Sequence, residues 1–198
     1  MSRLEQRAKP LIISMMSTAP PGSAVILTPD QTASLATWAI KTAWMSEESD
    51  PGRRTTTQEM RRALYRYNLP PEHSAVWAGR HVGSLDFHIR QAQIQVARSD
   101  RPWDSNDVRQ VLWTGLIFCG IAFLAYTVDG WGVAPPQRDP SRWVQLWPSS
   151  ADVRYPPPGP VSDFDVLLAV VNQSPNIHLP VVDRFVRDPF GVRQHRRN

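Results

Sequence analysis

Cysteine is nearly absent from this sequence, because Cys119 is the only one among 198 residues. A single cysteine excludes an internal disulfide and any zinc site built from several cysteines, and it fits a reducing compartment. Cys119 lies within the most apolar run of the chain, so we expect a buried and unreactive thiol. The segment from Met1 to Pro10 has no apolar stretch of the kind that secretory signals carry. We therefore expect a cytoplasmic protein.

The common catalytic motifs are missing as well. The sequence has no Gly-x-Ser-x-Gly, no Gly-x-x-x-x-Gly-Lys and no Gly-x-Gly-x-x-Gly, and its five histidines include no His-x-x-x-His pair. Asp86 and His88 alternate onto one strand face, with His81 near the adjoining turn, which leaves a small metal or hydrolase site as a minor hypothesis. We expect no catalytic residue, no metal site and no small-molecule cofactor, and hence a protein that is not an enzyme.

Lysine is scarce, because only Lys9 and Lys41 occur among 22 basic residues and the rest are arginine. The planar guanidinium of arginine suits phosphate recognition. A GC-rich genome also favours arginine codons, and the arginines are spread over the whole chain. The densest group predicts a basic, partly aromatic helix face that binds nucleic acid; it comprises Arg53, Arg54, Arg61, Arg62, Tyr65 and Arg66. The alternative is an ordinary solvated helix face.

Two capping boxes predict helix starts. Thr28, followed by Pro29 and Gln31, predicts a helix to about Glu48. Thr56 with Glu59 predicts a second helix to about Tyr67. Its expected inner stripe is Met60, Ala63, Leu64 and Tyr67. Two further helices are expected, over Leu4–Met16 and, after Ser162, over Asp163–Asn172.

Alternating apolar residues predict strands in the middle of the chain. A strand over Ala75–Arg80, a hairpin loop and a returning strand from Leu85 come first, and the apolar parity flips near Gln91, which indicates a β-bulge or a change of covering layer. One long strand over Val111–Tyr126 and a short one over Trp143–Trp147 follow. The uncharged run 111–128 is also just long enough for a membrane helix, but its glycines, threonines and β-branched residues favour a strand, and a membrane location is not expected.

Together these patterns predict an α+β fold with helices packed on one face of a mainly antiparallel sheet of about four strands. We expect a single domain over residues 1–173 and a basic, flexible tail over 174–198. The eight tryptophans are mostly expected in the core. Trp131, Trp143 and Trp147 adjoin proline-rich loops, where an exposed aromatic patch would form a protein interface. The alternative function is therefore a module that docks a host or partner protein.

Several short motifs run through the chain in an order that resembles a known family. They are Met1-Ser2-Arg3-Leu4-Glu5 with Lys9-Pro10, Leu27-Thr28-Pro29-Asp30-Gln31, Leu35-Ala36-Thr37-Trp38-Ala39-Ile40-Lys41-Thr42-Ala43, Pro70-Pro71, Val76-Trp77, Leu146-Trp147-Pro148 and Tyr155-Pro156-Pro157. The sequence is similar to the carboxy-terminal region of HNH-endonuclease-like proteins of actinobacteria and their phages. In that family, a Cys-Asn-x-Gly-Trp stretch of the metal-bound nuclease head runs directly into the Met-Ser-x-Leu-Glu segment.

The resemblance implies a body without its nuclease head. The paired cysteines and the His-Asn-His elements of the family would precede Met1, so no catalytic or metal-binding residue is carried over to this sequence. An HNH nuclease needs a histidine base and a bound cation. The resemblance thus implies a non-catalytic domain, either a stand-alone phage or prophage product or a fragment of a longer nuclease, with weak electrostatic contact to nucleic acid as its remaining activity.

Overall fold

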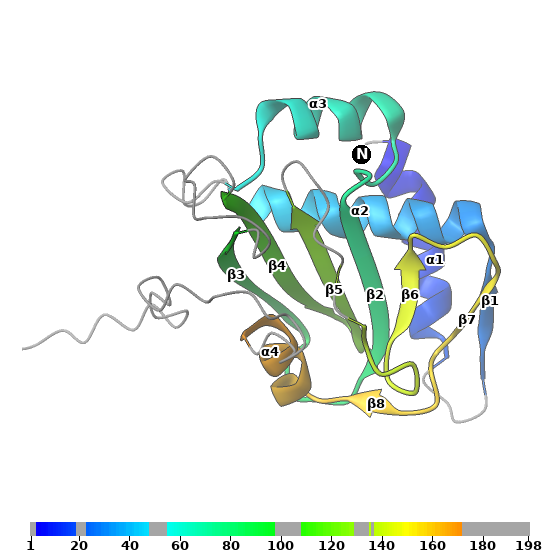
Figure 1. The fold of residues 1–198 in the computed structure, drawn as a ribbon. Coiled ribbons are helices and arrows are strands. Elements are labelled where there is room, and N and C mark those ends of the chain that lie inside the picture. Colours follow the sequence, from blue (N-terminus) through cyan, green and yellow to red (C-terminus); the bar gives the residue numbers. More distant parts are fainter. Residues whose placement is uncertain are drawn as a thin grey trace, which may run out of the picture.

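The computed structural model describes residues 3–18, 23–47, 55–97, 108–128, 135 and 137–171. Its helices are α1 (Arg3–Met16), α2 (Pro29–Glu47), α3 (Gln58–Tyr67) and α4 (Asp163–Val171). Its strands are β1 (Val25–Leu27), β2 (Ser74–His81), β3 (Phe87–Ala97), β4 (Val108–Phe118), β5 (Ile121–Val128), β6 (Val144–Trp147), β7 (Val153–Tyr155) and β8 (Pro160–Val161). The α+β class predicted from the sequence is confirmed (Figure 1). The expected basic tail, 174–198, lies outside the described residues.

The uncharged run 111–128 forms a hairpin instead of the single long strand that we predicted. β4 and β5 pair antiparallel, and Phe118 opposite Ile121 is the residue pair next to the turn. Cys119 and Gly120 make the two-residue turn between them, with φ angles of 48° and 79°, the left-handed pair that tight hairpins require. Cys119 is consequently exposed, and the prediction of a buried thiol is wrong. Among the described residues, no helix is both long and apolar enough to cross a bilayer.

The main sheet has six strands, with β3-β4-β5-β2-β6 in spatial order and β8 parallel to β2. The predicted count of about four strands is too low, partly because one predicted strand is the β4–β5 hairpin. β2 and β3 do not pair with each other, so the predicted hairpin between them is wrong. Their connection instead crosses the end of the β4–β5 hairpin, where His81 N donates to Gly120 O and Cys119 N donates to Asp86 O, both at 2.8 Å. This arrangement of β2 to β5 is that of a Greek key.

Helices cover both faces of the sheet, whereas we predicted them on one face only. α1 and α2 pack on the face to which Val76 and Ala78 point, and α4 packs on the face of Ala75 and Trp77. In Figure 1, α2 runs across the far side of the strands and α4 lies on the near side. The near-continuous burial of β2 and β5 follows from this double cover.

The parity flip in β3 comes from the same double cover. The pairing of β3 with β4 is continuous from Phe87 to Ala97, so no bulge occurs. Ile89 packs on the core beneath α2, while Ala92 and Ile94 point the other way and pack on the core beneath α4. A change of covering layer, one of the two explanations that the sequence allowed, is therefore the correct one.

A second, two-stranded sheet pairs β1 with β7, with Val25 opposite Tyr155 and Ile26 opposite Arg154. Leu27 and Tyr155 are buried in the core beneath α2. From Tyr155 the chain continues through Pro156-Pro157-Pro158 to β8, which lies against the end of β2. The proline-rich segment therefore joins the small sheet to the large one.

Candidate functional site

Helix α3, which carries four of the six predicted nucleic-acid-binding residues, begins one residue later than expected. Thr57, and not Thr56, is its N-cap, and its hydroxyl accepts a hydrogen bond from Met60 N at 3.2 Å. Asn68 ends the helix in the left-handed conformation, with φ of 52°. Leu64 is the only residue of α3 that is buried. Most of the helix surface therefore takes no part in the core.

Arg61 does not lie on the exposed face of α3, which corrects the sequence prediction. Its Nε and Nη2 atoms donate to Thr56 Oγ1 at 3.0 and 2.7 Å, and Nη2 lies 3.3 Å from Glu47 Oε2. The Glu47 side chain is 1% exposed and also accepts from the hydroxyl of Thr56 and from Thr55 N. Arg61 thus balances a buried carboxylate at the end of α2, and this role explains its inward position.

Arg62, Tyr65 and Arg66 do lie on the outer surface of α3, as predicted. All three are exposed, and Tyr65 has 62% of its surface free. Residues three and four apart share one face of a helix, so these side chains form one patch. We call Arg62, Tyr65 and Arg66 the α3 face. Arg53 and Arg54, the other two predicted members, lie outside the described residues.

Tyr67 adds a second exposed aromatic ring beside this face. The sequence analysis placed Tyr67 in the buried stripe, but it is 63% exposed, and Arg66 Cζ lies 5.6 Å from the centre of its ring. Tyr67 is the last residue of α3, and the left-handed Asn68 ends the helix directly after it. The apolar periodicity that predicted the buried stripe does not show that Tyr67 lies at the helix end. A charged and aromatic surface of this composition can neutralise phosphates and stack on bases.

Trp143, the central residue of the predicted tryptophan interface, is buried. Trp143 is only 7% exposed and packs in the core beneath α4, and Trp147 is half-buried against the core beneath α2. Trp131 lies outside the described residues. Trp77 and Trp113 stack with ring centres 6.0 Å apart and are covered by the guanidinium of Arg138. None of the tryptophans that the structure describes is exposed.

His88, which together with Asp86 formed the minor hypothesis of a metal or hydrolase site, has an arginine as its side-chain partner. His88 Nε2 accepts a hydrogen bond from Arg90 Nε at 2.7 Å. Burial, and then the positive charge of Arg90, lower the pKa of His88. No group of three or more possible metal ligands occurs among the described residues.

His81 instead pairs with Asp163, a contact that the sequence did not suggest. His81 Nε2 lies 2.7 Å from Asp163 Oδ1, and the backbone and hydroxyl of Ser84 donate to Oδ2 at 3.0 and 3.1 Å. The carboxylate stands between the imidazole and the serine, whereas activation of a serine nucleophile needs the imidazole between the other two. The cluster therefore fastens the first residue of α4 to the connection between β2 and β3.

Comparison with models of protein families, with curated proteins and with solved structures finds no match for the chain. The similarity to HNH-type nucleases therefore rests on the sequence motifs alone. The α3 face is the part of the predicted site that the structure brings together, with Arg62, Tyr65 and Arg66 as its members and Tyr67 as its neighbour.

Proposed function

We propose that this chain is a non-catalytic domain, related to the body of HNH-type nucleases, whose α3 face makes weak electrostatic contact with nucleic acid. The observation that carries the proposal is the exposure of Arg62, Tyr65 and Arg66 on one side of a helix that buries only Leu64. A helix with so small a share in the core leaves a surface on which two guanidinium groups and an aromatic ring remain available.

The chemistry of the α3 face favours single strands over duplex. Tyr65 offers a ring for base stacking, and bases are accessible for stacking only where they are unpaired. Arg62 and Arg66 supply sequence-independent attraction to phosphates. No groove-reading motif occurs in the sequence, so the contact is expected to discriminate little between base sequences.

The test is the binding of a fluorescent single-stranded oligonucleotide, measured by anisotropy between about 50 and 200 mM salt. Replacing Arg62 and Arg66 together by Ala should weaken binding and lower the slope of log K against log salt by about 0.7 per arginine removed. Arg7→Ala is the matched control, because Arg7 is exposed on α1, outside the α3 face. Equal losses in the control and in the double variant would contradict a role for this face.

Tyr65→Ala separates stacking from charge. We expect it to reduce affinity for the single strand by about 1–3 kcal/mol for one stacked base and to leave duplex affinity nearly unchanged. The salt slope should stay the same, because no charge is removed. If the variant binds single strands as well as the unaltered chain does, the aromatic part of the proposal is wrong.

A further inference from the structure

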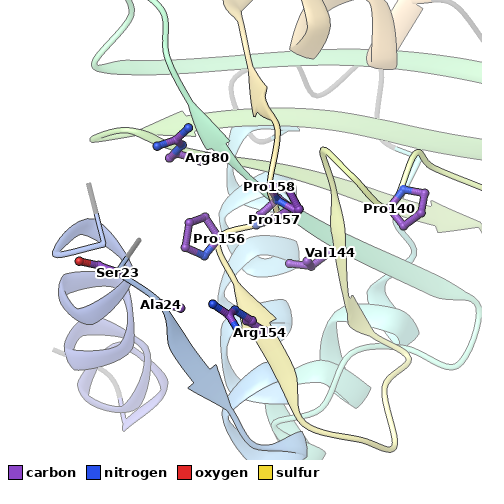
Figure 2. A pocket seen from close by; sticks show the side chains of 9 residues that line it. All are labelled: Ser23, Ala24, Arg80, Pro140, Val144, Arg154, Pro156, Pro157 and Pro158. Carbon is purple, nitrogen blue, oxygen red and sulfur yellow. The ribbon is translucent and has the colours of Figure 1, made fainter. Parts of the chain in front are cut away.

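A hollow of about 610 Å³ opens beside the small sheet (Figure 2), and no residue of helix α3 lines it. Its walls come from the residues just before β1, the end of β2, β6 and the loop before it, β7, and the proline-rich segment after β7. Most of the residues that line it are two arginines, Arg80 and Arg154, and four prolines, Pro140, Pro156, Pro157 and Pro158. The volume lies within the range of pockets that hold small ligands, roughly 300–1,000 Å³.

Arg80 reaches the hollow because of its position in β2. Val76 and Ala78 point into the core beneath α2, and Arg80 follows them on the same strand face. Its side chain is half-buried, and its Nε is fully buried without a hydrogen-bond partner among the described residues. A half-buried guanidinium without a counter-charge is costly, and an anion bound at its accessible nitrogen atoms would balance that charge.

Arg154 provides the second positive charge. It lies in β7 between Val153 and Tyr155, with its side chain exposed on the opposite face from theirs. Figure 2 shows Arg80 and Arg154 on either side of Pro156 at the edge of the hollow. Neither guanidinium has an ion pair or side-chain hydrogen bond within the described part of the chain, and no carboxylate is among the lining residues.

The remaining wall suits a ligand that is apolar beyond its charged group. Three consecutive prolines present rigid rings and no backbone N–H groups, so this wall is apolar and already ordered before binding. Two guanidinium groups match a dianion, and a phosphate monoester carries a charge of about −1.5 to −2 at neutral pH. A carboxylate would balance only one of the two.

We propose that this hollow is a binding site for a phosphate monoester, with Arg80 and Arg154 holding the phosphate and the prolines contacting the organic part of the ligand. The phosphate belongs either to a free small molecule or to the 5′ end of a nucleic acid. The site lies apart from the α3 face and does not depend on the function proposed for it.

The test is calorimetric titration of the full chain at constant ionic strength with pyrophosphate, AMP, adenosine and acetate. We expect AMP and pyrophosphate to bind and adenosine and acetate to bind at least tenfold more weakly, since both lack a dianionic phosphate. Arg154→Ala should raise the dissociation constant of AMP about tenfold or more, and Arg154→Lys should restore part of the affinity. Arg7→Ala serves as the control, and it should leave AMP binding unchanged.

Arg154 is exposed, so Arg154→Ala is expected to fold with an unchanged thermal midpoint in the absence of ligand. Equal affinity of Arg154→Ala and the unaltered chain for AMP would overturn the proposal, as would equal affinity for AMP and adenosine.

A second experiment identifies the source of the phosphate. It compares the binding of a 5′-phosphorylated oligonucleotide with that of its 5′-hydroxyl form, in chains that carry Arg62→Ala and Arg66→Ala. A preference for the phosphorylated form assigns the site to nucleic-acid ends, and binding of AMP alone assigns it to small molecules.

Discussion

Arg61 reaches from α3 to Glu47, the last residue of α2, and places its Nη2 atom 3.3 Å from a carboxylate oxygen that is almost completely buried. Removing the guanidinium leaves that carboxylate with Thr55 N and the Thr56 hydroxyl as its donors among the described residues. We therefore expect Arg61→Met to lower the free energy of unfolding by about 1.5–3 kcal/mol, measured by urea denaturation.

The same variant distinguishes Arg61 from the arginines of the α3 face. Arg61→Met should leave oligonucleotide affinity unchanged at temperatures where the chain is folded, in contrast to the double variant of Arg62 and Arg66. Combining Arg61→Met with Glu47→Gln should recover part of the lost stability, because the buried charge is then removed as well. A loss of affinity without a loss of stability would contradict the inward role of Arg61.

Asp163 makes stability depend on acid pH. Hydrogen bonds, above all from the backbone N–H of Ser84 and then from His81 and the Ser84 hydroxyl, hold the pKa of Asp163 below its ordinary value of 3.8, although desolvation acts the other way. The unfolded chain therefore takes up the proton first as the pH falls. The stabilisation is present above about pH 4 and is lost as the pH falls through the lowered pKa of the folded chain.

Urea unfolding from about pH 5 to about pH 3 checks this expectation. At about pH 5, Asp163→Asn should be less stable than the unaltered chain, and it should lose less stability as the pH is lowered. Both proteins should still lose some stability on acidification through Asp165. Burial raises the pKa of Asp165, but hydrogen bonds from Arg142 and Ser162 outweigh it and lower that pKa overall. Identical slopes for the two proteins would show that the contacts of Asp163 are not what lowers its pKa.

Gly115 in β4 leaves the space into which α4 packs. A Cβ atom at this position would lie 2.8 Å from Val166 Cγ1 and 2.9 Å from Val170 Cγ2. Valine side chains have few alternative rotamers in a helix. Gly115→Ala should therefore lower the free energy of unfolding by about 1–3 kcal/mol through overpacking.

A second substitution tests the cause of that loss. In a chain that already carries Val166→Ala, the cost of Gly115→Ala should be smaller, because one of the two methyl contacts is gone. Gly79→Ala is a poor control, since its Cβ would meet a backbone oxygen, Arg142 O, at 2.8 Å. Strict additivity of the Gly115 and Val166 changes in urea unfolding would show that α4 does not pack against β4 at this point.

Cys119 should react with a thiol reagent while the chain is folded. The residue is exposed in the β4–β5 turn, so one equivalent of a disulfide reagent should couple to it without denaturant, as absorbance of the released thiol will show. Cys119→Asn should raise the free energy of unfolding by up to about 1 kcal/mol, because asparagine tolerates the left-handed conformation better than cysteine. Labelling that requires urea would place the thiol back in the core.

Features encoded by neighbouring residues could be predicted from the sequence. The capping box of α2 is present, with Thr28 N donating to Gln31 Oε1 at 2.9 Å and Gln31 N donating weakly to Thr28 Oγ1 at 3.4 Å. Helices α1, α2 and α4 and strands β2 and β6 lie within a few residues of their predicted bounds. These elements depend on caps and periodicity, which a short window contains.

Features that depend on distant partners could not be predicted. The β4–β5 turn interrupts an apolar run with Cys119 and Gly120, and a buried strand tolerates both residue types. Arg61 has the same sequence signal as Arg62, and only the packing of Glu47 against α3 separates their roles. Arg80 lies near the end of a buried strand, and in the sequence it does not differ from an ordinary polar residue at a strand end. Only the packing of the small sheet and the proline-rich segment places it at the hollow.

The Greek-key order of β2 to β5 also has a kinetic consequence. β2 precedes β3, β4 and β5 in the chain but pairs with β5, so this pairing closes a loop that contains two intervening strands. Non-local pairing of this kind slows folding, because the chain loses loop entropy before the contacts form. The step should depend on the closure of the β4–β5 turn. In stopped-flow experiments we therefore expect Cys119→Asn to speed refolding more than it slows unfolding, and the opposite result would place turn closure after the rate-limiting step.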